Sequence, residues 1–285
     1  MAAAGNEKRP GLTRRKALLA GASSPLALAL AGKMGDEAAA AQAPATGTPL
    51  VAGVKALTFD VFGTVVDWRS SIIREGQRVG KLKGLDIHWA TFADRWAATY
   101  GRGTRQVREG KLPWTKVDQL LRAGLEELLE EFAITGLTPT EVDDLNRVWE
   151  RLSPWPDAVP GLERLRSRHI VATLSNGNVS LLVNLAKHTN LPWDCVLSSE
   201  LARHYKPDRE VYETAAALLS LPSESIMMVA SHKYDLRAAK GVGFRTAWVT
   251  RPMEHGPGRK VDTAPDDSFD ITASDFLDLA HKLGV

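Results

Sequence analysis

The chain has 285 residues, of which 44% are hydrophobic and 25% are charged. This composition indicates a globular protein of one large or two modest domains and excludes a disordered or collagen-like chain. The 36 basic and 34 acidic residues give a net charge of +2. Because no basic block follows residue 50, the sequence does not support a nucleic-acid-binding surface. The single cysteine, Cys195, excludes an internal disulfide and a cysteine-rich zinc site.

Residues 1–43 differ in character from the rest of the chain. A Thr-Arg-Arg run at 13–15 precedes an uncharged, Ala- and Leu-rich stretch over 17–32, and an Ala-rich run follows. This order is typical of an export signal, and the arginine pair resembles a twin-arginine leader. We therefore expect an exported, periplasmic protein without a stable membrane span, because the apolar stretch is short and weakly hydrophobic. The alternative is a plain N-terminal extension on a cytoplasmic protein.

A linker rich in Pro, Gly and Thr, residues 44–53, leads to the first predicted strand. Residues 54–59 form a mostly apolar and β-branched run that stops at Asp60, and Gly63 and Thr64 then favour a turn. The pattern predicts a buried strand whose C-terminal end presents Asp60.

The pattern becomes helical between residues 70 and 152. Leucines recur three or four positions apart between Leu120 and Phe132, and residues 138–141 (TPTE) predict a capping box with proline at the first helical position. No convincing strand interrupts this segment. We therefore expect residues 70–152 to form a helical cap, inserted after the first strand, that closes a pocket above the strand ends.

Predicted strands and helices alternate in the remainder of the chain. The predicted strands are residues 169–174, 194–198, 226–230, 244–250 and 270–272, and the predicted helices are 179–188, 209–219, 235–242 and a last one from residue 274. This alternation predicts an α/β fold with a Rossmann-like, doubly wound parallel sheet, built from residues 54–69 and 153–285. Ligands of such sheets bind at the carboxyl ends of the strands.

Polar side chains follow the ends of four predicted strands. They are Asp60, the pair Ser175-Asn176, Lys206 and Asp235. Because these ends meet at one edge of a parallel sheet, two carboxylates, an ammonium and a hydroxyl/amide pair are expected to converge. Each residue taken alone also has a simpler interpretation as a turn or cap residue, so the prediction depends on their joint order.

These residues belong to four segments that resemble the ordered motifs of the haloacid dehalogenase superfamily. The segments are residues 60–64 (DVFGT), 174–178 (LSNGN), 205–208 (YKPD) and 229–235 (VASHKYD). Within the superfamily they look closest to the type II, (S)-2-haloacid dehalogenases, and the resemblance covers residues 54–250. It implies hydrolysis of small (S)-2-haloalkanoic acids to (R)-2-hydroxyacids, with neither a metal nor another cofactor.

Most members of the superfamily are phosphatases, so the choice of branch needs a reason. The phosphatases carry a second Asp two residues after the nucleophile and an acidic pair in the fourth motif that helps to hold Mg²⁺. Here Phe62 takes the first position, and Lys233 stands beside a single carboxylate, Asp235. The loss of oxygen ligands and the added positive charge favour a monoanionic substrate over a phosphate dianion.

The resemblance assigns the chemistry to Asp60, which would attack the halogen-bearing carbon and form an ester that water then hydrolyses. Lys206 would keep Asp60 ionised, and Thr64 would donate a hydrogen bond to its carboxylate. Asp235 would orient either Lys206 or the water, with His232 nearby. For His232, an ordinary polar loop position is an equally good interpretation.

Four further positions would bind the substrate. Ser175, Asn176 and the backbone amides that open the following helix would hold the substrate carboxylate, because helix N-termini favour anions. Phe62 and Tyr234 would provide apolar walls, since a desolvated carboxylate is the stronger nucleophile.

One cap position departs from the family pattern. The relatives carry an Arg that receives the halide, and the alignment of residues 93–100 places Ala97 there. Loss of such a donor can slow turnover about 10²- to 10³-fold. Arg102 or Arg105 could enter the pocket from the next turns. Two alternatives therefore stay open, a phosphatase of the same superfamily and a weakly active protein that binds small carboxylates. A homodimer is also possible.

Overall fold

The computed structural model describes residues 51–285. The predicted export signal and most of the linker lie outside the described residues. A six-stranded parallel sheet has the order β5-β4-β1-β6-β7-β8, and β2 and β3 form a separate antiparallel ribbon. The strands are β1 (Ala56–Phe59), β2 (Val66–Asp67), β3 (Ser153–Pro154), β4 (Ile170–Ser175), β5 (Cys195–Ser198), β6 (Ile226–Ala230), β7 (Arg245–Val249) and β8 (Ile271–Ala273).

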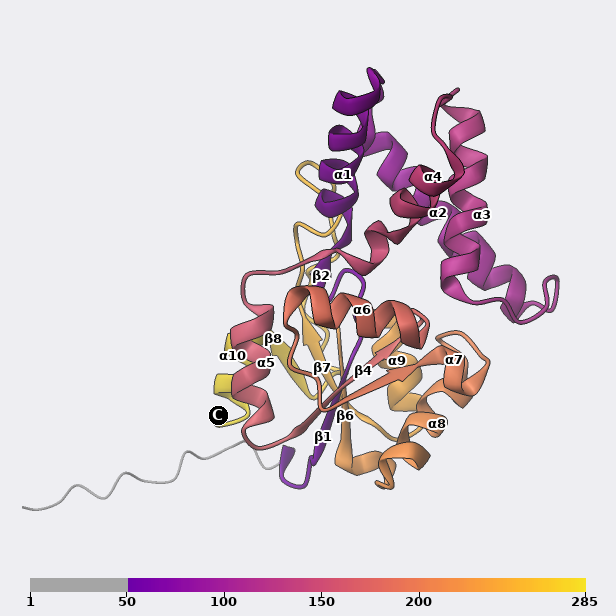
Figure 1. The fold of residues 1–285 in the computed structure, drawn as a ribbon. Helices are drawn as coiled ribbons and strands as arrows, with labels where there is room; N and C mark the ends of the chain where they lie inside the picture. Colours follow the sequence, from indigo (N-terminus) through magenta and orange to yellow (C-terminus); the bar gives the residue numbers. More distant parts are fainter. Residues whose placement is uncertain (1–50) are drawn as a thin grey trace, which may run out of the picture. The chain divides into compact units, whose positions relative to one another are not determined.

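Helices precede and follow these strands in the alternating order that the sequence predicts (Figure 1). They are α1 (Trp68–Lys83), α2 (Trp89–Arg108), α3 (Val117–Glu131), α4 (Pro139–Asn146), η2 (Arg147–Glu150), α5 (Ala158–Arg166), α6 (Val179–Thr189), α7 (Ser199–Ala202), α8 (Arg209–Leu219), η3 (Ser223–Ser225), α9 (Lys233–Gly241) and α10 (Phe276–Lys282). In the part of the chain that the structure describes, none of these helices is both long and apolar enough to cross a membrane.

The spatial order of the six parallel strands is 3-2-1-4-5-6 when they are numbered along the chain. This is the order of a doubly wound sheet, so the predicted fold class is confirmed. The strand order reverses between β1 and β6, and a crevice at the carboxyl ends of these two strands is where such folds bind ligands. Asp60 follows β1 directly and its amide donates to the carbonyl of Val229 in β6, which fixes Asp60 at this point.

Alternating side chains of the central strand enter two different cores. Leu57 and Phe59 pack on the face covered by α5, α6 and α10, whereas Ala56 packs on the face covered by α8 and α9. Strands buried on both faces read as nearly continuous apolar runs, which explains why the sequence locates β1 and β6 so closely.

The helices α1 to α4 lie between β2 and β3, beyond the carboxyl end of β1 (Figure 1). The chain enters and leaves this helical insert through the β2–β3 ribbon, where Val66 pairs with Pro154 and Asp67 with Ser153. Ser71 links β2 to β3, because its hydroxyl donates to the Asp67 carbonyl and accepts a hydrogen bond from the Ser153 amide. The sequence does not reveal this ribbon, since two-residue strands have no periodicity. The exact domain boundaries stay a prediction.

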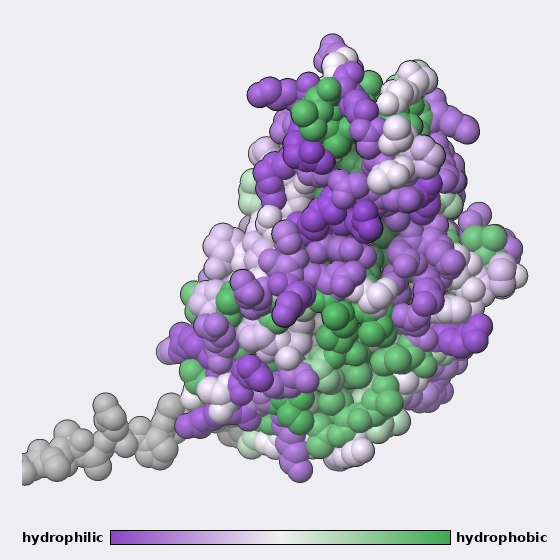
Figure 2. Space-filling model, in the orientation of Figure 1, coloured by the Kyte–Doolittle hydropathy of each residue, from purple (hydrophilic) through white to green (hydrophobic). Residues whose placement is uncertain are grey.

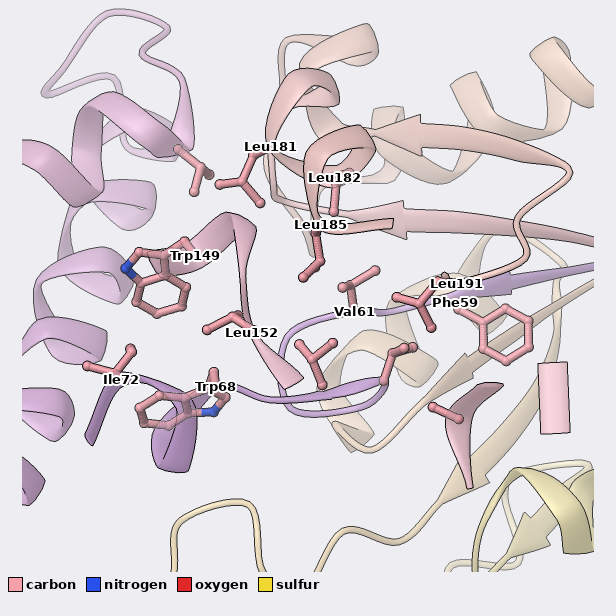
Figure 3. Packing of buried hydrophobic residues seen from close by; sticks show 14 of the residues in the cluster. Phe59, Val61, Trp68, Ile72, Trp149, Leu152, Leu181, Leu182, Leu185 and Leu191 are labelled. Carbon is pink, nitrogen blue, oxygen red and sulfur yellow. The ribbon is translucent and has the colours of Figure 1, made fainter. Parts of the chain in front are cut away.

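The helical insert shares one hydrophobic core with the sheet domain. Figure 3 shows Trp68 and Trp149 of the insert on either side of Leu152, with Ile72 farther out and Leu181 of α6 on the side of Trp149. On the outside, the side chains over α1 to α4 are mostly hydrophilic in the orientation of Figure 2, whereas hydrophobic side chains gather below α6. The predicted capping box is present, because Thr138 accepts from the Glu141 amide and Glu141 accepts from the Thr138 amide.

Gly161 of α5 marks a close contact between two helices that cover the sheet. A Cβ atom added there would lie 2.4 Å from Cβ and 2.9 Å from the carbonyl carbon of Phe276 in α10. We expect Gly161→Ala to lower the free energy of unfolding by about 1–3 kcal/mol through overpacking. Gly101→Ala in α2 is the matched control, because an added Cβ meets nothing within 4 Å, and helix propensity then raises stability by up to about 1 kcal/mol. Urea unfolding measures both, and equal effects would contradict the packing argument.

Candidate active site

A cavity of about 180 Å³ lies at the crevice between β1 and β6, between the strand ends and the helical insert. Its lining residues are Asp60, Phe62, Trp68, Ala97, Tyr100, Trp149, Ser175, Asn176, Lys206, His232, Tyr234, Glu254 and His255. Seven of the nine predicted site residues are among them. The other two, Thr64 and Asp235, are buried directly behind the lining and contact it through hydrogen bonds.

Asp60 has one strongly held carboxylate oxygen and one that is less constrained. Its Oδ2 accepts from the Thr64 hydroxyl at 2.7 Å and lies 2.9 Å from Nδ1 of His232. Its Oδ1 lies 3.5 Å from the Lys206 ammonium. Burial alone would raise the pKa of Asp60, but the charge of Lys206 and the hydrogen bonds from His232 and Thr64 outweigh it and hold the pKa well below 3.8. Asp60 is therefore an ionised carboxylate at neutral pH.

Lys206 is held in place by Asp235. The Lys206 ammonium lies 2.7 Å from Oδ2 of Asp235, and the Tyr212 hydroxyl donates to Oδ1 of Asp235 at 2.5 Å. Asp235 is almost fully buried, and this burial raises its pKa against the attraction of Lys206. Because both oxygens of Asp235 have partners, the geometry favours its orienting Lys206 over its orienting a water. The sequence does not single out Tyr212, which looks like one more apolar position of the helix 209–219.

The other side of Asp60 is occupied by a second buried carboxylate that the sequence does not single out. Nε2 of His232 lies 3.0 Å from Oε1 of Glu254, which is only 5% exposed. Burial lowers the pKa of His232, but its hydrogen bonds to Asp60 and Glu254 outweigh this and raise the pKa well above 6.5. His232 is therefore an imidazolium between two carboxylates in the resting site. Glu254 lies in a Pro- and Gly-rich loop after β7, where no periodic pattern points to it.

The glycine of the first motif is explained by this carboxylate. A Cβ atom at Gly63, whose φ is +86°, would lie 2.1 Å from Oε1 of Glu254. Only glycine combines this backbone conformation with the space that Glu254 needs. The contact between Gly63 and Glu254 thus explains why the turn after β1 needs a glycine opposite the loop after β7.

Ser175 and Asn176 lie on the opposite wall of the cavity, at the end of β4. Oδ1 of Asn176 accepts from the Ser199 hydroxyl at 2.7 Å and from the Lys206 amide at 2.9 Å. These contacts orient the side chain of Asn176, which lines the cavity together with Tyr100. Two of the backbone amides expected to hold a substrate carboxylate already donate hydrogen bonds within the protein. The Gly177 amide donates to the Ser175 hydroxyl and the Val179 amide to the Glu200 carboxylate.

Aromatic rings form the remaining walls. The Phe62 ring contacts Tyr100 and Trp149 edge-to-face, with centroids 6.3 and 5.5 Å apart. Trp149 is buried in the core and also lines the cavity. Tyr234 is 54% exposed, so it forms the rim of the cavity beside His232 more than a buried wall.

Among the described residues, the cavity lining contains no arginine. Ala97 faces the cavity, whereas Arg102 pairs with Glu127 on the exposed side of α2 and Arg105 is exposed. The expectation that one of these arginines enters the pocket is therefore wrong. Lys233 also lies outside the lining. It pairs with Asp262 at 2.8 Å and stacks over the Trp248 ring, so it does not contribute its charge to the site in the way the sequence argument assumed.

The donor set around Asp60 does not fit a divalent cation. Mg²⁺ needs several oxygen ligands in octahedral geometry, but Asp60 and Asp235 share the Lys206 ammonium between them. Phe62 adds no ligand at the position where a second acid would be needed. The arrangement is that of an ionised carboxylate held beside a fixed ammonium.

Comparisons with known proteins agree with this arrangement. The model of the haloacid dehalogenase-like hydrolase family matches residues 54–243. The chain is 30% identical to (S)-2-haloacid dehalogenase 4A of Burkholderia cepacia, over 71% of this chain and 85% of that protein. The crystal structure of an L-2-haloacid dehalogenase is similar with a TM-score of 0.77 and 42% identity, over 81% of this chain and all of that one. The crystal structure of a defluorinating L-2-haloacid dehalogenase is similar with a TM-score of 0.78 and 40% identity, over 83% of this chain and 98% of that one.

The charge of His232 makes stability depend on pH. Since folding raises the pKa of His232 above 6.5, its contribution is complete below pH 6.5 and is lost as pH rises through the folded value. We expect His232→Asn to lower the free energy of unfolding by roughly 1–3 kcal/mol below pH 6.5, and by less as pH rises. His188→Asn, an exposed position at the end of α6, is the control. Urea unfolding between about pH 6 and 10 measures both, and a pH-independent loss in His232→Asn would contradict the assignment.

Proposed function

The chain belongs to the haloacid dehalogenase-like hydrolase family, and on that premise we propose that it hydrolyses small (S)-2-haloalkanoic acids to (R)-2-hydroxyacids. The observation that carries the proposal is the Asp60 carboxylate, ionised, fixed by Lys206 and open to a small aromatic cavity. Relatives of known activity support the same choice, since those at 30% and 42% identity are named haloacid dehalogenases.

The first step is a displacement at carbon. Oδ1 of Asp60 attacks the carbon that bears the halogen, the carbon–halogen electron pair leaves with the halide, and an ester forms with inversion of configuration. Lys206 keeps the attacking carboxylate ionised and aimed, and the Phe62 and Trp149 rings limit the water around it. Aromatic walls suit this step because they exclude solvent without competing for the nucleophile.

The second step is attack on the enzyme and not on the substrate carbon. Water adds to Cγ of Asp60, and the bond between Cγ and Oδ1 breaks, so that Oδ1 leaves with the substrate carbon as the alkoxide and the carbon keeps the inverted configuration. Charge develops on Oδ2, to which the Thr64 hydroxyl donates. Thr64 is itself fixed as a donor, because its oxygen accepts from the Ser231 amide at 2.9 Å.

The cavity sets the size and charge of the substrate. At about 180 Å³ it suits a short-chain acid. The Ser175 hydroxyl and the Asn176 amide would bind the substrate carboxylate on the wall facing Asp60. With Ala97 in the usual arginine position, Tyr100, one helical turn further along α2, brings the only polar side chain among the cavity-lining residues of α2.

Two alternatives have less support. A phosphatase would need a metal beside Asp60, and the donor set described above does not fit one. A carboxylate-binding protein without turnover would not need the ionised, doubly hydrogen-bonded Asp60. Chloride release from (S)-2-chloropropionate, phosphate release from a generic ester with and without Mg²⁺, and calorimetry with lactate distinguish the three functions.

Two further expectations concern export and the oligomeric state. Export through the twin-arginine pathway concerns residues outside the described part, and N-terminal sequencing of secreted material tests it. A homodimer, which the sequence leaves possible, is the second expectation. Light scattering of the purified protein tests that expectation.

An isotope experiment tests the covalent mechanism directly. We expect a single turnover of (S)-2-chloropropionate in ¹⁸O-labelled water, with enzyme in excess, to place the label in Asp60, because water attacks Cγ. Peptide mass spectrometry locates the label. Asp60→Asn is the control and should show no turnover, although its fold is retained. Label found only in the hydroxyacid would instead mean that water attacks the substrate directly.

A further inference from the structure

We propose that His232 and Glu254 form a proton relay that activates the water for hydrolysis of the Asp60 ester, with His232 as the base and Glu254 as its positioning residue. Glu254 lies outside the four motifs that identify the family. The inference rests on the proposed function, because it concerns the second half of that reaction.

The three groups lie in series. Nδ1 of His232 is 2.9 Å from Oδ2 of Asp60, and Nε2 is 3.0 Å from Oε1 of Glu254. The Nδ1 atom is therefore the nitrogen that faces the carbon which the water attacks. His232 and Glu254 both line the cavity, so a water molecule entering from the substrate side can reach this nitrogen.

Glu254 is buried in a loop that several hydrogen bonds hold in place. The Trp68 indole donates to Oε1 of Glu254, at 3.4 Å. Three residues earlier in the same loop, Arg251 forms a paired hydrogen bond with Asp157 and also donates to the Thr64 carbonyl. The loop is thus tied to the strand end that carries Asp60. Together with the space left by Gly63, these contacts form a built site for one carboxylate.

Formation of the ester changes the charge beside His232. In the resting site two carboxylates, Asp60 and Glu254, hold the imidazolium, and Lys206 and Asp235 balance one another nearby. Once Asp60 is an ester, its negative charge is gone and only Glu254 stabilises the cation. Loss of a neighbouring opposite charge favours the neutral form. The Nδ1 proton can then leave to solvent, since the His232 side chain is 26% exposed, while Nε2 keeps its proton on Glu254.

The proton balance closes over the cycle. Nδ1 of neutral His232 takes a proton from the water as its oxygen bonds to Cγ of Asp60. When the ester bond breaks, that proton passes to the departing alkoxide and gives the hydroxyacid. Asp60 is left as a carboxylic acid, and it returns its proton to Nδ1 to restore the resting ion pair. The proton released after alkylation accompanies the halide, so haloacid and water give hydroxyacid, halide and one proton.

Glu254→Gln separates the two half-reactions. Glutamine keeps the shape and can accept from Nε2, but it lacks the charge that makes His232 a base. We expect one equivalent of chloride to be released from (S)-2-chloropropionate at close to the wild-type rate, followed by turnover slowed about 10²- to 10⁴-fold. Mass spectrometry should then find the ester accumulated on Asp60. Glu224→Gln, an exposed acid in η3, is the control and should behave as wild type.

A second variant covers the case in which glutamine disturbs the loop. In Glu254→Ala, added formate should restore ester hydrolysis if the missing element is a carboxylate next to His232. Two results for Glu254→Gln would overturn the relay while leaving the nucleophilic role of Asp60 intact. One is an equal reduction of the chloride burst and of turnover, and the other is an unchanged turnover. Failure of the proposed function is a different result, in which the wild-type enzyme releases no chloride and forms no ester.

Discussion

The arrangement of the site depends on the burial of one ammonium, that of Lys206. Its side chain is only 2% exposed, and a buried charge of this kind is tolerated only with close, well-oriented partners. Asp235 provides the fixed partner and is itself fixed by Tyr212. Asp60 provides the second partner and is the one that can change its charge during a reaction. The parallel sheet makes this possible, because it brings the ends of β1 and β6 and the loop after α7 to the same place.

The two oxygens of Asp60 face two different environments, and this division matches the two halves of the proposed reaction. Oδ1 faces the ammonium and the aromatic cavity, the side of the proposed alkylation. Oδ2 faces Thr64 and His232, the side of the proposed hydrolysis. Phe62 belongs to the same design, since it stands where the phosphatases carry their general acid and adds an apolar wall. The helical insert then closes the cavity with Trp149, Tyr100 and Ala97.

Sequence reasoning predicts the residues that follow buried strands, because apolar runs locate the strands and parallel topology gathers their ends. Asp60, Lys206 and Asp235 are found in this way, and the family resemblance, which depends on the order of the four motifs, then predicts a role for each of them. Glu254 and Tyr212 are missed for different reasons. Glu254 lies in a loop without periodicity, and Tyr212 looks like a core position of its helix. Lys233 shows the converse error, since adjacency in sequence to a site residue did not place its charge in the cavity. Helix α9 begins at Lys233, two residues before the predicted start, and the Lys233 ammonium is held by Asp262 and the Trp248 ring instead of the cavity.

The central claim is that Lys206 and its neighbours keep Asp60 ionised so that it can bond directly to carbon. Rapid-quench experiments give the rate constant of chloride release in a single turnover. Its dependence on pH reports the ionisation of the attacking group in this step. Because the pKa of Asp60 is held well below 3.8, the rate constant should stay constant as pH falls from about 7 toward that value. A rate constant that declines between about pH 5 and 3.9 would show an attacking group of ordinary pKa, and a decline already between about pH 7 and 5 would show a raised one; either result would contradict the account.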